Sequence, residues 1–146
     1  MPVKDQTIYP RHWKQFSLYI RTERSGGKCE VCGVDNYAVG ARDRFGEFRT
    51  EGSIHSLNSD VGLHLFGDSF TFKMSRIVLT VAHLDAEGDI CRCQDETGFL
   101  CANPDHVKAM CQKCHNSYDR PKRNKNAKIT NEAKKDANRG LFTEAV

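Results

Sequence analysis

The pattern of hydrophobic and polar positions predicts a helix near the start of the chain, over residues 10–25. Trp13, Phe16 and Ile20 recur at spacings of three and four residues, so a helix would bring their side chains onto one face. Gly26 and the glycine after it follow this run, as glycine does beyond a helix C-terminus. We therefore expect one amphipathic helix that ends at these glycines.

The clearest strand is expected over residues 76–84, which are apolar and β-branched and end next to His83. A loop is expected over residues 85–104. The pattern then predicts a second helix over residues 104–118, which Pro121 would end because proline cannot continue a helix ladder.

The remaining segments carry weaker patterns. Residues 34–75 mix charged residues, glycines and isolated aromatic residues, which is typical of irregular hairpins or an inserted loop. The segment 121–146 is expected to form a basic arm with some helix at 130–140. The sequence therefore predicts one domain, 1–120, followed by that arm. Within the domain we distinguish an N-terminal helix 10–25, a cysteine knuckle 29–33, an inserted irregular region 34–75 and a core 76–119.

Composition limits how much the chain can stabilise by burial alone. Only 38% of the 146 residues are hydrophobic and 28% are charged, so a metal ion or a partner would help such a domain. The net charge is +3, but residues 120–139 hold eight basic and two acidic side chains. A basic arm on a near-neutral body indicates a polyanionic partner. A solvated tail that aids solubility is an equally good interpretation of the charge.

The seven cysteines need an explanation other than disulfides. The N-terminal residues lack the apolar segment of a signal peptide, and no run approaches the ~18 apolar residues of a membrane span. We therefore expect a cytoplasmic protein that does not enter a membrane, in a compartment that keeps thiols reduced. An odd number of cysteines in closely spaced pairs favours metal ligation there.

Two Cys-x-x-Cys pairs are the strongest single signal: Cys29 with Cys32, and Cys111 with Cys114. Four thiolates suit tetrahedral Zn²⁺, and the long interval between the pairs predicts a site that ties the N-terminal knuckle to the start of the C-terminal helix. Buried free thiols or a redox pair are the alternatives, although a redox motif lacks its usual βαβ context here.

A third group of cysteines, Cys91, Cys93 and Cys101, lies in the expected loop. These three thiolates could bind a second zinc ion if a fourth ligand joined them, and His106 is a conceivable fourth. Free thiols in a loop are the alternative.

Three histidines follow the expected elements in order. His83 ends the strand, His106 falls at the start of the expected helix, and His115 follows Cys114 on it. Such a site could hold a divalent ion against a phosphate while a neutral imidazole activates water.

Residues 81–85 and 105–119, together with the upstream Cys29-x-x-Cys32 pair, resemble the core of HNH (ββα-metal) endonucleases. The pattern is a hydrophobic strand ending in His, a loop, and a Cys-x-x-Cys-His helix. The resemblance covers residues 27–33 and 77–120, and it is strongest to small HNH proteins of phages and prophages. It implies an α+β fold with a ββα-metal, treble-clef-like core stapled by a four-cysteine zinc site.

The resemblance also implies roles for individual residues. His83 would be the general base, and His106 would stand where the family usually has Asn and would support that base. His115 would bind the catalytic ion, with Asp119 one helical turn later as a further ligand. Many members have a metal-binding Asp or His directly before the catalytic His, where this chain has Ala82.

Asp85 is one substitute for that missing ligand, because it falls on the same strand face as His83. Otherwise His115, Asp119, water and phosphate oxygens would hold the ion.

The resemblance therefore implies a metal-dependent endonuclease that hydrolyses DNA phosphodiester bonds, by nicking or by double-strand cleavage, in a bacterial or phage-infected cell. Its cofactors would be a structural Zn²⁺ and a catalytic Mg²⁺ or other divalent cation. The alternative is a non-catalytic zinc module that binds nucleic acid. The side chains expected to contact the DNA backbone are Arg120, Lys122, Arg123, Lys125 and Lys128.

Overall fold

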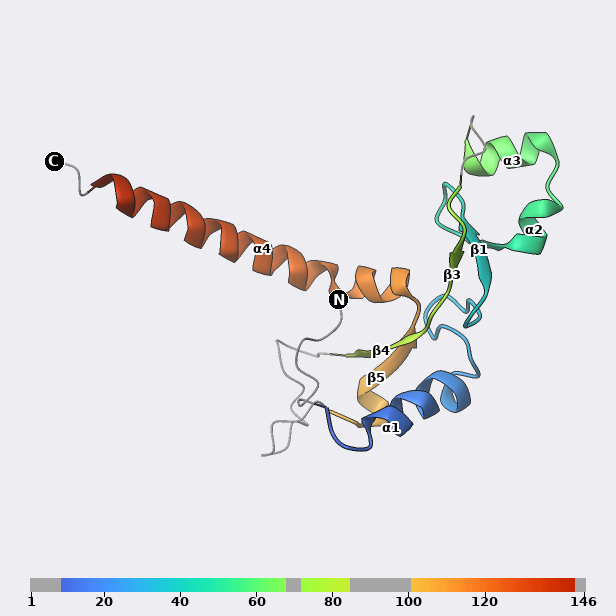
Figure 1. The fold of residues 1–146 in the computed structure, drawn as a ribbon, viewed down its shortest axis with the longest axis horizontal. Helices are drawn as coiled ribbons and strands as arrows, with labels where there is room; N and C mark the ends of the chain where they lie inside the picture. The colour runs from blue at the N-terminus through green and yellow to red at the C-terminus, as the bar shows by residue number, and fades with distance from the viewer. Residues whose placement is uncertain (1–8, 68–71, 85–100, 144–146) are drawn as a thin grey trace. The chain divides into compact units, whose positions relative to one another are not determined.

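The computed structural model describes residues 9–67, 72–84 and 101–143, with the backbone alone over 140–143. The chain divides into two compact units, Met1–Gln112 and Lys113–Val146. The elements of the first unit are α1 (Trp13–Tyr19), the π-helical turn η2 (Ile20–Arg24), β1 (Val39–Arg42), β2 (Phe48–Thr50), α2 (Glu51–His55), α3 (Ser59–Phe66), β3 (Ser75–Arg76), β4 (Thr80–His83), the 3-10 turn η3 (Pro104–His106) and β5 (Val107–Met110). The helix α4 (Gln112–Thr143) begins at the last residue of the first unit and makes up the described part of the second. Figure 1 shows this mixture of helices and small antiparallel sheets, which confirms the mixed α and β class.

The N-terminal helix forms close to where the sequence predicts it. α1 begins at Trp13, whose N–H donates to Pro10 O, and η2 continues the helix to Arg24. Gly26, with φ of 61°, follows the last turn in the left-handed conformation that favours glycine. The prediction for residues 10–25 is therefore confirmed, apart from the wider last turn.

Residues 34–75 are more regular than expected. β1 pairs with β2 and with β3 in an antiparallel sheet of order β2-β1-β3. The helices α2 and α3 follow β2, and each begins at a side-chain cap, Thr50 for α2 and Asn58 for α3. The predicted hairpin is present, but it belongs to a sheet with two short helices rather than to an irregular loop.

The strand expected over residues 76–84 is divided between two sheets. β3 pairs with β1, whereas β4 pairs with β5, and the buried side chains of Ile77 and Leu79 lie between the two strands. The Leu79 N–H donates to Asn36 Oδ1 at 3.0 Å and not to a neighbouring strand. The prediction that the strand ends at His83 is confirmed.

The helix expected over residues 104–118 is wrong for its first half. η3 is a single turn, and β5 follows it and pairs antiparallel with β4, with Thr80 opposite Met110 and His83 opposite Val107. Lys108 is exposed between buried neighbours, as the period of two in a strand requires. The strand has only four residues, and Ala109 and Met110 are both buried, so its alternation is too short to compete with the helical spacing of the residues around it.

Pro121 does not end the last helix, contrary to expectation. It lies inside α4, which runs to Thr143 and includes the helix predicted at 130–140. The proline removes one main-chain hydrogen bond, but the residues after it are rich in Lys and Ala, which favour helix. α4 is polar on all sides, and among the described residues no helix combines the length and hydropathy that crossing a membrane requires.

The core of the first unit lies between η2 and the β4–β5 pair. Its largest fully buried side chains are Ile20, Leu79, Val107 and Cys111. One comes from η2, one from the segment before β4, one from β5 and one from the residue directly after β5. This packing fixes the position of Cys111 and of the end of β4.

Candidate metal centre

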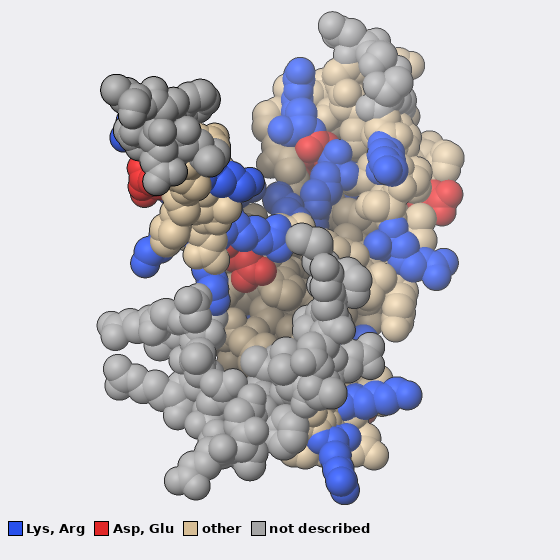
Figure 2. Space-filling model, turned by 60° about the vertical axis from the view of Figure 1, so that its left-hand side comes forward, with Lys and Arg blue, Asp and Glu red and all other residues tan. Residues whose placement is uncertain are grey.

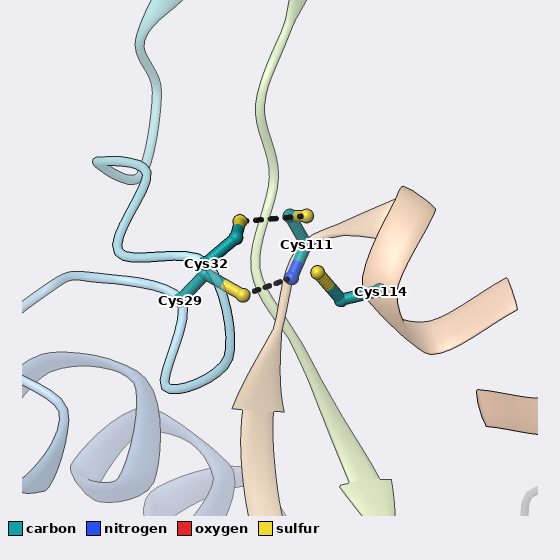
Figure 3. A group of neighbouring side chains, drawn as sticks. All are labelled: Cys29, Cys32, Cys111 and Cys114. Atoms are coloured by element: carbon teal, nitrogen blue, oxygen red, sulfur yellow. Dashed lines mark hydrogen bonds between the residues drawn. The ribbon is translucent and has the colours of Figure 1, made fainter. Parts of the chain in front are cut away.

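The four cysteines of the two Cys-x-x-Cys pairs gather at one point. The Sγ atoms of Cys29, Cys32, Cys111 and Cys114 all lie within 4.8 Å of one another. Cys29 and Cys32 come from a turn, Cys111 follows β5, and Cys114 is in the first turn of α4, as Figure 3 shows. This cluster could hold a metal ion such as zinc, since four thiolates are a typical zinc ligand set. The predicted four-cysteine cluster is therefore confirmed.

The knuckle that carries the first pair is a tight turn closed by main-chain hydrogen bonds. The Gly33 N–H donates to Cys29 O at 2.8 Å, and the Cys29 N–H donates to Val34 O at 2.9 Å. Gly33 has φ of 75°, which a residue with a Cβ adopts only with strain. The glycine thus lets the chain reverse so that both sulfurs face the same point.

The local electrostatics favour a thiolate at Cys29. Burial by itself would raise the pKa of this thiol, but backbone N–H groups of Cys32, Cys111 and Val31 donate to the sulfur. Together these hydrogen bonds lower the pKa of Cys29 to about 7. The Cys111 N–H lies 3.3 Å from the sulfur. A thiolate is the form that binds metal, so this environment favours ligation.

The knuckle is also attached to β5 by contacts that involve no cysteine. The Glu30 N–H donates to Ala109 O at 2.9 Å, and the Ala109 N–H donates to Glu30 Oε2 at 2.5 Å. Arg24 Nη2 donates to the same carboxylate oxygen at 2.5 Å and to Val107 O at 2.7 Å. These contacts hold η2, the knuckle and β5 together, so the first three cysteines are positioned by the fold itself.

His83 lies at the end of β4 in a half-buried position. Its Nε2 is 3.0 Å from Cys101 O, and its ring stacks on Trp13 with centroids 5.2 Å apart. Sequence reasoning assigned Trp13 only to an apolar helix face, and no local signal in the sequence indicates this stack. Two elements that are distant in the chain therefore fix the imidazole.

The prediction that His106 lies on the helix of His115 is wrong. His106 lies in η3 before β5, where its carbonyl accepts from the Leu84 N–H at 2.8 Å. Its Nδ1 is 3.6 Å from Cys101 Sγ. Cys101 is buried and contacts both rings, His83 through its carbonyl oxygen and His106 through its sulfur, so it links the two histidines.

His115 and Asp119 share one face of α4, as predicted from their spacing. His115 Nε2 lies 3.5 Å from Asp119 Oδ2, and Arg123 Nη2 lies 3.6 Å from the same oxygen. An imidazole and a carboxylate on one helix face form a donor set that a divalent cation can use.

Asp85, Cys91 and Cys93 lie outside the described residues, so the predicted second zinc site and the substitute ligand stay predictions. The basic residues expected to contact DNA are all exposed on α4: Arg120, Lys122, Arg123, Lys125 and Lys128. The face drawn in Figure 2 carries more Lys and Arg than Asp and Glu side chains.

No family model, no curated protein and no solved structure matches this chain.

Proposed function

We propose that the protein is a metal-dependent endonuclease of the HNH class, which hydrolyses phosphodiester bonds of DNA. The observation that carries the proposal is the order of elements around His83. This histidine ends β4, β4 pairs antiparallel with β5, and β5 leads through Cys111 into α4, whose first turn bears Cys114 and His115. A strand, a strand and a helix in this order make up the ββα-metal core that the sequence resembles.

The contacts of His83 suit a general base. An Nε2–H that donates to Cys101 O selects the tautomer in which Nδ1 is the basic nitrogen. In that tautomer Nδ1 takes a proton from the water that attacks phosphorus. The stack on Trp13 restricts rotation of the ring, so the base keeps one orientation.

His115 and Asp119 would hold a divalent cation such as Mg²⁺, because their donor atoms lie on one face of α4. A bound divalent cation supplies positive charge for the developing negative charge on phosphate. In the four-cysteine cluster a zinc ion would have a structural role, joining the knuckle to the start of α4. A cytoplasmic location would keep these thiols reduced.

The basic side chains of α4 are exposed and would contact the DNA backbone. Contacts to phosphates do not depend on the base sequence. We therefore propose weak sequence preference and a strong dependence of binding on salt.

A non-catalytic zinc module that binds nucleic acid is the second candidate, and Ala82 favours it. Its methyl side chain has no atom that binds metal, so the position before His83 supplies no ligand. The residue is 1% exposed and pairs with Lys108 across the strands.

Cleavage of supercoiled plasmid separates the two candidates. We would compare EDTA with added Mg²⁺, Mn²⁺ or Ni²⁺ for the wild type, for His83→Ala and for His55→Ala, a control at an exposed position. Metal-dependent nicking or linearisation that only His83→Ala abolishes would support the nuclease. Retained zinc and DNA binding with no cleavage under any ion would favour the binding module.

A further inference from the structure

Arg42 lies at the end of β1 and contacts the cysteine cluster. Its Nη2 lies 3.5 Å from Cys111 Sγ, while its Nη1 donates to Gly46 O at 3.1 Å. The guanidinium carbon is 5.6 Å from the centre of the Phe48 ring. Three separate contacts thus hold the cation in one orientation beside the sulfur.

The surroundings of Arg42 are themselves fixed. Arg42 pairs with Phe48 in the β1–β2 register, and the turn between these strands is closed by Asp43. The Asp43 carboxylate accepts from the N–H groups of Phe45 at 2.9 Å and Glu47 at 3.0 Å. Because this turn sets the position of Gly46 O, the guanidinium is directed to Cys111 by the hairpin and not by the cysteines.

A cation at this position matches the charge that the cluster would carry. Four thiolates around Zn²⁺ leave two negative charges uncompensated. Cys111 is 0% exposed, so water cannot solvate its sulfur. An arginine is always protonated, and an N–H donated to a thiolate by a charged group is stronger than a neutral hydrogen bond.

We propose that Arg42 is the charge partner of the metal centre, a positioning residue that binds the outer side of the Cys111 thiolate without ligating the ion. The sheet β2-β1-β3 therefore supports metal binding from outside the two Cys-x-x-Cys pairs. This inference rests on the zinc centre of the proposed function, but not on nuclease activity.

Two consequences follow for the metal. Loss of an outer hydrogen bond to a ligand weakens metal affinity, typically by about 10–100-fold. A thiolate without the donated N–H is also more nucleophilic, so a thiol reagent should release zinc faster. Arg42→Lys keeps the charge but lacks the planar fork that reaches Gly46 and Cys111 together, so its effect should be intermediate.

The test uses the full chain and three variants: Arg42→Gln, Arg42→Lys and Arg44→Gln. Arg44 is the matched control, because it lies in the same hairpin and its side chain donates to His64 O instead of a cysteine. Zinc affinity is measured by competition with a fluorescent chelator, and zinc release is timed after addition of a thiol reagent. The Co²⁺ absorption spectrum reports the ligand set, and far-UV circular dichroism reports the fold.

We expect Arg42→Gln to bind zinc about 10–100-fold more weakly and to release it faster, with Arg42→Lys in between. Arg44→Gln should match the wild type, and every variant should give a tetrahedral thiolate Co²⁺ spectrum. Equal affinity and release in Arg42→Gln and the wild type would overturn the inference, as would an equal loss in Arg44→Gln.

If Arg42→Gln fails to fold, Arg42→Lys decides by the same measurements. A wild-type chain that binds no zinc would overturn the metal centre itself, and this is a different result from unchanged affinity in the variants.

Discussion

The indole of Trp13 stacks on the imidazole of His83, with ring centroids 5.2 Å apart and an interplanar angle of 15°. Trp13 also contacts Phe16, at 5.5 Å between centroids, so the apolar face of α1 forms an aromatic cluster at the end of β4. None of the residues of α1 is fully buried. The apolar face that the sequence pattern predicts thus lines the position of the proposed base at Trp13 and joins the core at Ile20.

In the proposed nuclease, Trp13→Ala should lower kcat by about 10–100-fold, because a base that can rotate loses its alignment with the attacked phosphate. Trp13→Phe should keep most of the activity, since a second ring can still stack. KM for plasmid should change little in either variant. The measurement is the rate of plasmid nicking against plasmid concentration, with Leu18→Ala, at an exposed position of the same helix, as control. A drop in kcat for Leu18→Ala as large as that for Trp13→Ala would contradict this role.

The ion pair of Arg24 with Glu30 should stabilise the metal-free protein. Both side chains are mostly buried, at 23% and 24% exposed, and the carboxylate also accepts from the Ala109 N–H. Glu30→Ala leaves the Ala109 N–H without this acceptor and removes the charge partner of Arg24, which keeps its hydrogen bond to Val107 O. The loss should lower the free energy of unfolding by about 2–3 kcal/mol. Urea denaturation in EDTA measures it.

The matched control is the exposed pair of Lys28 with Asp35, at 56% and 67% exposed. Lys28→Ala should change the free energy of unfolding by less than about 1 kcal/mol, because solvent screens such pairs. Equal losses for Glu30→Ala and Lys28→Ala would mean that the link between the knuckle and β5 contributes no more to the free energy of unfolding than an exposed ion pair does.

The sequence predicts the cysteine cluster because its information is local. Each Cys-x-x-Cys pair places two sulfurs on one short turn, and four such sulfurs in one chain have few other uses. The end of a strand at His83 is also predictable, because the β-branched apolar run stops there, but the division of that run between two sheets is not. Each Cys-x-x-Cys pair is local in the chain, whereas the meeting of the two distant pairs is inferred from the four ligands that zinc prefers.

What the sequence does not predict depends on distant contacts. Arg42 and Cys111 are 69 residues apart, and Trp13 meets His83 only because α1 and β4 converge. β5 is stabilised by pairing with β4 rather than by its own four residues, so its pattern carries too little information.

Gly40 should not tolerate a side chain. A Cβ at this position of β1 would lie 2.0 Å from Arg49 O and 2.9 Å from Phe48 Cζ, and the first of these is backbone that cannot turn aside. Gly40→Ala should therefore lower the free energy of unfolding by about 3 kcal/mol. Gly52→Ala is the control, since a Cβ there meets nothing within 4 Å and Ala favours the helix α2. Thermal unfolding of the two variants measures the difference, and equal stability would disprove the close approach of β1 and β2.

The carboxyl of Asp43 should make stability depend on acid pH. Burial by itself would raise its pKa, but the N–H groups of Glu47 and Phe45 and the guanidinium of Arg49 lower it below the ordinary value of 3.8. A lowered pKa in the folded state gives stability that is fully present above the ordinary pKa and is lost as the pH falls through the lowered one. The wild type should therefore lose stability below about pH 4, and Asp43→Asn should lose less over the same range.

At pH 7 the variant Asp43→Asn should be less stable than the wild type by about 2 kcal/mol, because an amide accepts weaker hydrogen bonds from Arg49 than a carboxylate does. Urea titrations at about pH 7, 5, 4 and 3 measure both the loss of stability in acid and the difference between the variant and the wild type at neutral pH. Glu47→Gln is the control, since Glu47 also pairs with Arg49, at 2.6 Å. If Glu47→Gln alters the pH profile and Asp43→Asn does not, the acid dependence comes from Glu47 and the prediction for Asp43 is wrong.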